Sequence, residues 1–203
     1  MFESNQIVLS SGENGQDRIE LLRDGSRLVF VVADGAGGRS GGAEAAELVV
    51  RLARERVGSL LSPGDCENLL GDIDHVISAD RIAGETTAVI VVVSPNKVFG
   101  ASAGDSGAWI LNGSNVDELS ERQIRKPFVG TGASLPVGFS RDALVGTLLV
   151  ATDGLLKYAS RESISTTIEK FSLRELPEAL IKLVRFASGN LPDDIAIGLC
   201  RPT

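Results

Sequence analysis

The sequence has 203 residues, 43% of them hydrophobic, and a formal net charge of −7 at pH 7. This length and balance indicate a single domain over residues 1–203, and the acidic surface excludes nucleic acid as an expected partner because it repels phosphate backbones. The longest apolar stretch, residues 143–151, is too short to span a bilayer, and two isolated cysteines without a signal segment indicate a cytoplasmic protein.

The first element expected along the chain is a β-hairpin. Residues 19–23 and 27–33 have strand character, and the turn sequence Asp24-Gly25-Ser26 separates them. Residues 28–33 are apolar on both faces of a strand, so we expect this second strand to lie inside a sheet.

Two helices are predicted next. Residues 42–57 are apolar at helical spacing, and a second helix is expected to begin with Ser62 as its N-cap and Pro63 in its first turn. The apolar positions of the first helix are Ala45, Leu48, Val49 and Leu52. Those of the second are Cys66, Leu69, Leu70, Ile73, Val76 and Ile77.

The second half of the chain returns to strands. The predicted elements are hairpins over 87–93 with 98–103 and over 107–111 with 115–119, a surface loop over 120–142, a buried strand over 144–152, a helix introduced by Ser172 and Glu175 at capping-box spacing, and a final strand over 195–200. Hairpin-linked strands with helices inserted in groups favour an α+β fold, with antiparallel sheets flanked by helices.

Acidic residues occur at three predicted strand ends. Asp34-Gly35 and Asp153-Gly154 each follow a buried strand, and Asp193-Asp194 precedes the last strand. Carboxylates that meet at the rim of a sheet repel one another unless a cation or a proton intervenes, and ligand sets made of oxygen select Mg²⁺ or Mn²⁺. Each site taken alone is more simply explained as a turn, because Asp-Gly is a common turn sequence.

Taken together and in their order, the short motifs favour a metal site over isolated turns. They resemble, in order, the motifs of the metal-dependent serine/threonine protein phosphatases, the protein phosphatase 2C family, and the match extends from about Gly15 to Leu199. The segments are Gln16-Asp17, Asp34-Gly35-Ala36-Gly37-Gly38, Thr86-Thr87-Ala88, Gly104-Asp105-Ser106, Ala151-Thr152-Asp153-Gly154-Leu155 and Asp193-Asp194-Ile195-Ala196.

The resemblance implies an α-β-β-α sandwich with two or three Mn²⁺ or Mg²⁺ ions at one edge of the sheets. Asp34 would then bridge two ions, with Gly35 offering its carbonyl oxygen. Asp153 and Asp193 would bind the first ion, Asp17 would contact the second through water, and Asp105 with Asp153 would form a third site. The catalytic residues would be Asp34, Asp153 and Asp193. The implied substrate is a phosphorylated protein, hydrolysed by in-line attack of a metal-bridging hydroxide.

Four positions depart from the family pattern. Gly12 stands where an arginine commonly binds the substrate phosphate, Gln16 where glutamate is frequent, Ala36 where some members have histidine, and Asp194 where asparagine is usual. The short chain and the missing arginine are more similar to the compact bacterial members. Arg39, five residues after Asp34, is the nearest candidate for a replacement phosphate-binding cation, against the simpler expectation that it points into solvent.

Other motifs carry less weight. Gly104-Asp105-Ser106-Gly107 is similar to the nucleophile motif of trypsin-like proteases, but that chemistry needs a histidine base, and the one histidine, His75, lies on the polar side of its predicted helix. The glycines near position 37 do not form a nucleotide-binding GxGxxG motif.

The prediction is therefore a phosphatase of phosphoserine and phosphothreonine. Two alternatives remain at this point: a catalytically weak or dead regulatory module that binds phosphoproteins, and a phosphatase of small phosphate esters.

Overall fold

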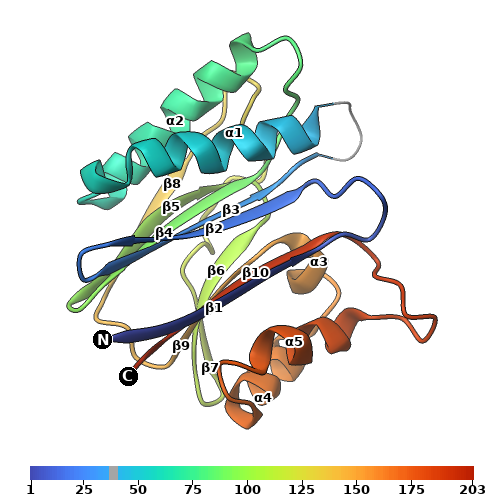
Figure 1. Cartoon of the computed structure of the whole chain (residues 1–203). Helices are drawn as coiled ribbons and strands as arrows, with labels where there is room; N and C mark the ends of the chain where they lie inside the picture. The colour runs from blue at the N-terminus through green and yellow to red at the C-terminus, as the bar shows by residue number, and fades with distance from the viewer. Residues whose placement is uncertain (37–40) are drawn as a thin grey trace.

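The structure is a computed structural model and describes residues 1–36 and 41–203. In this part of the chain the strands form two five-stranded antiparallel sheets that pack face to face (Figure 1). The longer helices α1 and α2 cover the outer face of one sheet, and the shorter helices α3, α4 and α5 cover the outer face of the other. The predicted α-β-β-α sandwich of the α+β class is therefore confirmed.

Sheet I has the strand order β2-β3-β4-β5-β8. Its strands are β2 (Asp17–Asp24), β3 (Arg27–Asp34), β4 (Ala88–Ser94), β5 (Lys97–Ala103) and β8 (Val137–Asp142). The predicted hairpin around Gly25 is the β2–β3 pair, and the predicted interior strand is β3, which lies between β2 and β4.

Sheet II has the order β1-β10-β9-β6-β7. Its strands are β1 (Phe2–Leu9), β6 (Gly107–Asn112), β7 (Asn115–Glu118), β9 (Thr147–Ala151) and β10 (Ile195–Pro202). The first and last strands of the chain pair with each other, so the two termini lie side by side (Figure 1).

Helices α1, α2 and α5 begin at or near the residues that the sequence indicates. Their bounds are α1 (Gly42–Glu55), the short 3₁₀ helix η1 (Val57–Ser59), α2 (Pro63–Ala79), α3 (Asp153–Leu156), α4 (Arg161–Lys170) and α5 (Leu176–Val184). Ser62 caps α2 as predicted, because its hydroxyl accepts the backbone N–H of Asp65. Val76 was placed wrongly in the apolar stripe of this helix: its side chain is 48% exposed.

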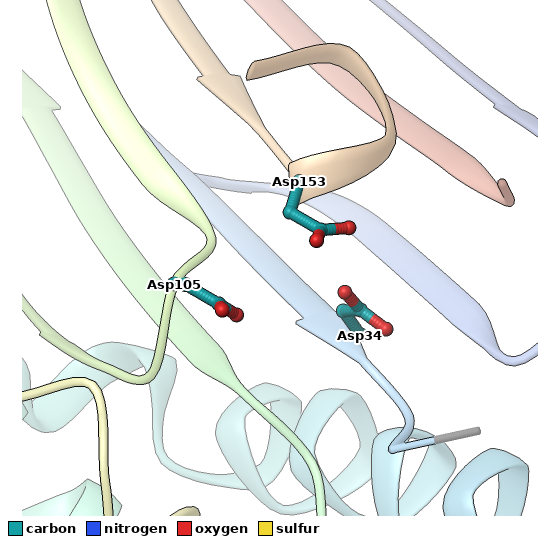
Figure 2. A group of neighbouring side chains, drawn as sticks. All are labelled: Asp34, Asp105 and Asp153. Atoms are coloured by element: carbon teal, nitrogen blue, oxygen red, sulfur yellow. The ribbon is translucent and has the colours of Figure 1, made fainter. Parts of the chain in front are cut away.

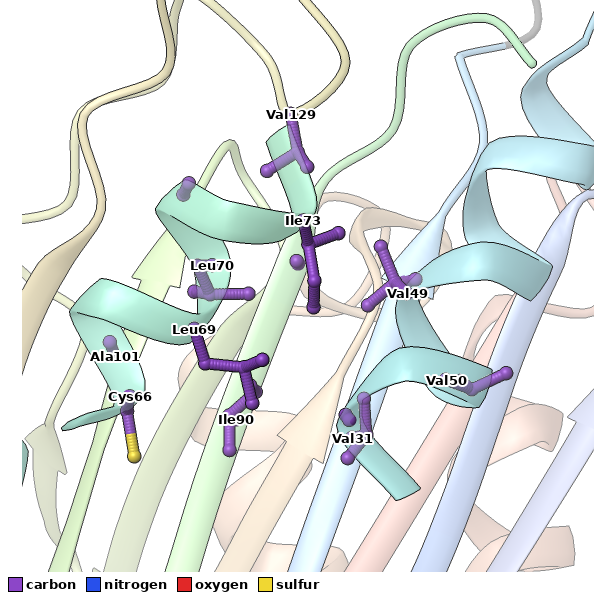
Figure 3. Close-up of a cluster of buried hydrophobic side chains, with 14 of the residues drawn as sticks. Val31, Val49, Val50, Cys66, Leu69, Leu70, Ile73, Ile90, Ala101 and Val129 are labelled. Carbon is purple, nitrogen blue, oxygen red and sulfur yellow. The ribbon is translucent and has the colours of Figure 1, made fainter. Parts of the chain in front are cut away.

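The core has three layers, one on each side of sheet I and one beneath the outer face of sheet II. Figure 3 shows the layer in which Val49 of α1 and Ile73 of α2 pack on the strand residues Val31 and Ile90. Alternate residues of β3 face opposite layers, with Val31 toward the helices and Phe30 toward sheet II. This burial on both faces explains why β3 reads as a continuous apolar run.

Three regions differ from the predictions. The loop predicted over 120–142 ends in a strand, β8, which pairs with β5 at an edge of sheet I. Only Phe139 of β8 is buried, because an edge strand covers the core with one face and leaves the other polar. Strand β1 and helices α3 and α4 were not predicted.

No helix in the described residues is long and apolar enough to cross a membrane.

Candidate functional site

Three aspartates converge where the two sheets meet at one edge. Asp34 ends β3 of sheet I, Asp105 lies in the connection from β5 to β6, and Asp153 opens α3 directly after β9 of sheet II. One carboxylate oxygen from each residue lies within 4.8 Å of the other two (Figure 2). The structure therefore brings together three of the predicted metal-binding residues from both sheets.

The backbone at Asp34 is fixed by the two threonines that directly precede β4. The Thr86 hydroxyl donates to the carbonyl oxygen of Asp34 at 2.8 Å, and the Thr87 hydroxyl accepts the N–H of Asp34 at 3.1 Å. Ser106 is fully buried, and its hydroxyl lies 2.6 Å from that of Thr87. Ser106 thus belongs to the hydrogen-bond network that holds Asp34, and the exposed His75 on α2 is no base for it.

Asp17 lies beside Asp34 in the β2–β3 pair and is only 3% exposed. Burial raises the pKa of Asp17 to about 7, to which the nearby Asp194 and Asp193 carboxylates contribute. Burial, together with the charges of Asp17, Asp153 and Asp105, raises the pKa of Asp34 to about 9. The site therefore concentrates more negative charge than its buried position accommodates without a cation or a proton.

The donor set fits a hard divalent cation. The close group offers only carboxylate oxygens, which Mg²⁺ and Mn²⁺ prefer. Two further buried oxygens, Oδ2 of Asp17 and Oε1 of Gln16, have no hydrogen-bond partner in the described part of the chain. Gly35 is also required sterically, because a Cβ there would lie 2.4 Å from the backbone of Gly42.

A comparison with protein-family models shows the family to which this chain belongs. The model of the family described as protein phosphatase 2C matches residues 8–184. The chain belongs to the protein phosphatase 2C family. Comparison with curated proteins finds no match.

Solved bacterial phosphatases share this fold. The serine/threonine phosphatase Stp1 from Staphylococcus aureus is 19% identical, with a TM-score of 0.86 over 100% of this chain and 96% of that chain. The serine/threonine phosphatase PstP/Ppp from Mycobacterium tuberculosis is 20% identical, with a TM-score of 0.78 over 98% of this chain and 97% of that one. The catalytic domain of PstP in complex with two manganese ions is 20% identical, with a TM-score of 0.77 over the same shares. At these identities the likeness establishes the fold.

In this protein phosphatase 2C chain, Asp193 lines the same pocket as Asp34 and Asp153, a cavity of about 670 Å³, but lies outside the close group of three oxygens. Burial raises the pKa of Asp193, and the Asp153 carboxylate adds to the effect.

The neighbouring Asp194 forms hydrogen bonds that hold a loop. Its carboxylate accepts the backbone N–H groups of Ser11 at 2.7 Å and Gln16 at 2.6 Å, and so closes the loop before β2 against the start of β10.

Sequence reasoning missed the residues that reach this pocket from the segment before β8. Lys126 and Phe128 both line it. Their segment is held by backbone hydrogen bonds of 2.9 and 3.0 Å between Val129 and Thr86. It is also held by the buried Asp74 of α2, whose carboxylate accepts the N–H groups of residues 130, 132 and 134. No sequence motif marked Lys126. The predicted phosphate ligand, Arg39, lies outside the described residues.

Proposed function

We propose that this chain is a metal-dependent phosphatase that hydrolyses phosphoserine and phosphothreonine monoesters of proteins, and that residues 1–203 form one catalytic domain. The observation that carries the proposal is the group of carboxylates from Asp34, Asp105 and Asp153, assembled from two sheets in a chain of the protein phosphatase 2C family. We further propose two or three Mn²⁺ or Mg²⁺ ions per chain. The Mn²⁺-bound structure of PstP supports this choice.

Different sets of carboxylates would bind the individual ions. Asp34 would bridge two ions beside the carbonyl of Gly35, and Asp153 with Asp193 would complete the first site. Asp17 would contact the second ion through water, and Asp105 with Asp153 would hold the third. When bound, such ions lower the pKa of coordinated water and offset the charge of the phosphoryl oxygens. The chain itself supplies the fixed spacing of these oxygens, through the threonine contacts at Asp34.

The test is hydrolysis of p-nitrophenyl phosphate by the purified chain with Mn²⁺ and with excess chelator. We expect turnover that depends entirely on the added ion. Full activity in chelator would overturn the metal-dependent mechanism. Metal-dependent binding of a phosphopeptide without any turnover would instead support the regulatory module. Turnover confined to small metabolites, with none of phosphopeptides, would support the small-ester alternative.

Gly12 lines the pocket but offers no cation to a substrate phosphate. Among the described residues that line the pocket, Lys126 is the only basic one, whereas six are acidic: Asp34, Glu85, Asp105, Asp153, Asp193 and Asp194. The Lys126 ammonium lies 5.3 Å from the centre of the Phe128 ring, which places it over a second lining residue. We assign Lys126 to binding of the substrate phosphoryl group.

Lys126→Ala should raise KM for p-nitrophenyl phosphate about tenfold, the effect expected from the loss of one charge-assisted hydrogen bond. Lys126→Arg should restore most of the affinity, since it keeps the charge. The matched control is Lys97→Ala, because Lys97 also stacks on a phenylalanine two residues later, at 5.7 Å, but lies outside the pocket. An unchanged KM in Lys126→Ala would reject the assignment, and Arg39→Ala would then test the remaining candidate.

A further inference from the structure

A second pocket, of about 630 Å³, adjoins the carboxylate site and shares Asp105 and Asp153 with it. It lies toward helix α3 and strands β6 and β7, and apart from Asp105 and Asp153 none of its wall residues has a proposed metal or phosphoryl contact. The residues that give it chemical character are Trp109, Glu118, Gln123, Arg125, Lys157 and Arg161. We call it the flanking pocket.

An unpaired donor lies in its wall. The Trp109 side chain is 4% exposed, and its indole Nε1–H has no hydrogen-bond partner in the described part of the chain. Nε1 lies next to Gly107, another wall residue, because a Cβ at this glycine would lie 3.5 Å from Nε1. A buried donor without a partner destabilises the protein, so a ligand that brings an acceptor oxygen to Trp109 would recover free energy.

The pocket also holds basic side chains. The Arg161 guanidinium lies 5.1 Å from the centre of the Trp109 ring and is paired with Glu118. Lys157 lies 3.6 Å from the Asp153 carboxylate, and Arg125 has no ion pair in the parts of the chain that the structure describes. Of the three basic side chains, Arg161 lies at the indole, and Arg125 is the one without an ion pair among the described residues.

The balance of charge depends on the neighbouring site. Among the described residues of the wall, three are basic and four are acidic, the latter being Asp105, Glu118, Glu121 and Asp153. Divalent ions held by Asp105 and Asp153 would offset two of the four acids and leave the pocket with an excess of positive charge. An anionic group would then be favoured there.

We propose that the flanking pocket binds an acidic side chain of the substrate, within a few residues of the phosphorylated serine or threonine. The inference rests on the proposed function. Because the two pockets meet at Asp105 and Asp153, a peptide with its phosphoryl group in the first would carry a neighbouring residue into the second. An extended chain advances about 3.3 Å per residue, so a residue one to three positions away from the phosphorylated one lies about 3–10 Å from it.

The single tryptophan of the chain makes occupancy of the pocket measurable, since any indole fluorescence comes from Trp109. The probes are peptides with a non-hydrolysable phosphonate in place of phosphoserine and one glutamate placed at each position from −3 to +3, each matched to its glutamine counterpart. In Mg²⁺, we expect one position at which glutamate binds about tenfold more tightly than glutamine and changes the emission of Trp109.

Arg125→Ala should bring this ratio of glutamate to glutamine affinity close to one. The matched control is Arg122→Ala, an exposed arginine of the same segment that does not line the pocket, and it should keep the ratio. Phosphopeptides with the same sequences should show the same preference in kcat/KM. An intact rate with p-nitrophenyl phosphate but no glutamate preference at any position would overturn this inference alone. If the unmodified chain did not hydrolyse p-nitrophenyl phosphate at all, the proposed function would be overturned.

Discussion

Asp34→Asn should lower kcat/KM for p-nitrophenyl phosphate at least ~10³-fold in saturating Mn²⁺, which corresponds to about 4 kcal/mol of transition-state stabilisation. Asparagine fills the same space but offers one neutral oxygen where a bridging carboxylate would offer two charged ones. Asp72→Asn is the control, since Asp72 of α2 forms a surface ion pair with Arg56 and lies outside the pocket. Full activity of the Asp34 variant would reject the assigned role.

The same variant should have the opposite effect on the stability of the metal-free protein. Burial and nearby carboxylates raise the pKa of Asp34 from 3.8 to about 9 in the folded state. At pH 7.5 without metal, folding therefore requires Asp34 to take up a proton, and this cost grows as the pH rises from about 4 toward 9. Asparagine needs no proton, so Asp34→Asn should stabilise the chelated protein by about 1–2 kcal/mol and raise Tm by several degrees.

Added Mn²⁺ should stabilise the unmodified chain and the Asp34→Asn variant to different extents. The unmodified chain should gain thermal stability with the ion, because binding to the folded state alone favours folding. The Asp34→Asn variant should lose most of this gain. Thermal denaturation with and without chelator measures both effects, and a variant that is less stable than the parent in chelator would show that Asp34 carries no repulsive strain.

The sequence predicted the parts of the fold whose side chains are apolar on a regular period. Strand β3 is recognisable because both of its faces are buried, and α2 because Ser62 caps it. The acidic residues at the ends of β3 and β9 stand out because each interrupts an apolar run. Asp105 has no such signal, and only its place in the ordered motifs indicated it.

The remaining features depend on contacts between distant residues. Strand β8 is a polar edge strand with one buried side chain, Phe139, so its sequence resembles a loop. Lys126 reaches the pocket because Asp74, more than fifty residues earlier, holds the segment that follows it. Asp194 departs from the family pattern in sequence, yet its carboxylate holds the loop that carries Ser11 and Gln16. None of these partners can be paired from spacing along the chain.

Gly154→Ala should be among the most destabilising single-methyl changes in the protein. Gly154 follows Asp153 at the start of α3, and a Cβ there would lie 1.9 Å from the carbonyl oxygen of Asp194. Backbone atoms cannot rotate away as a side chain can, so α3 or the start of β10 must shift. We expect a loss of about 2–4 kcal/mol in the free energy of unfolding, or roughly 4–16 °C in Tm.

The shift would also separate Asp153 from Asp193, so the stabilisation gained from Mn²⁺ should fall together with the rate of p-nitrophenyl phosphate hydrolysis. Gly71→Ala is the matched control, because a Cβ at Gly71 inside α2 meets nothing within 4 Å. In a helix interior this change should raise stability by about 0.5–1 kcal/mol and leave the rate unchanged. Thermal denaturation with and without Mn²⁺ distinguishes the two variants. A Gly154→Ala protein that keeps both its Tm and its response to Mn²⁺ would contradict this prediction. It would show that α3 and the start of β10 accommodate the added methyl group without disturbing the carboxylate site.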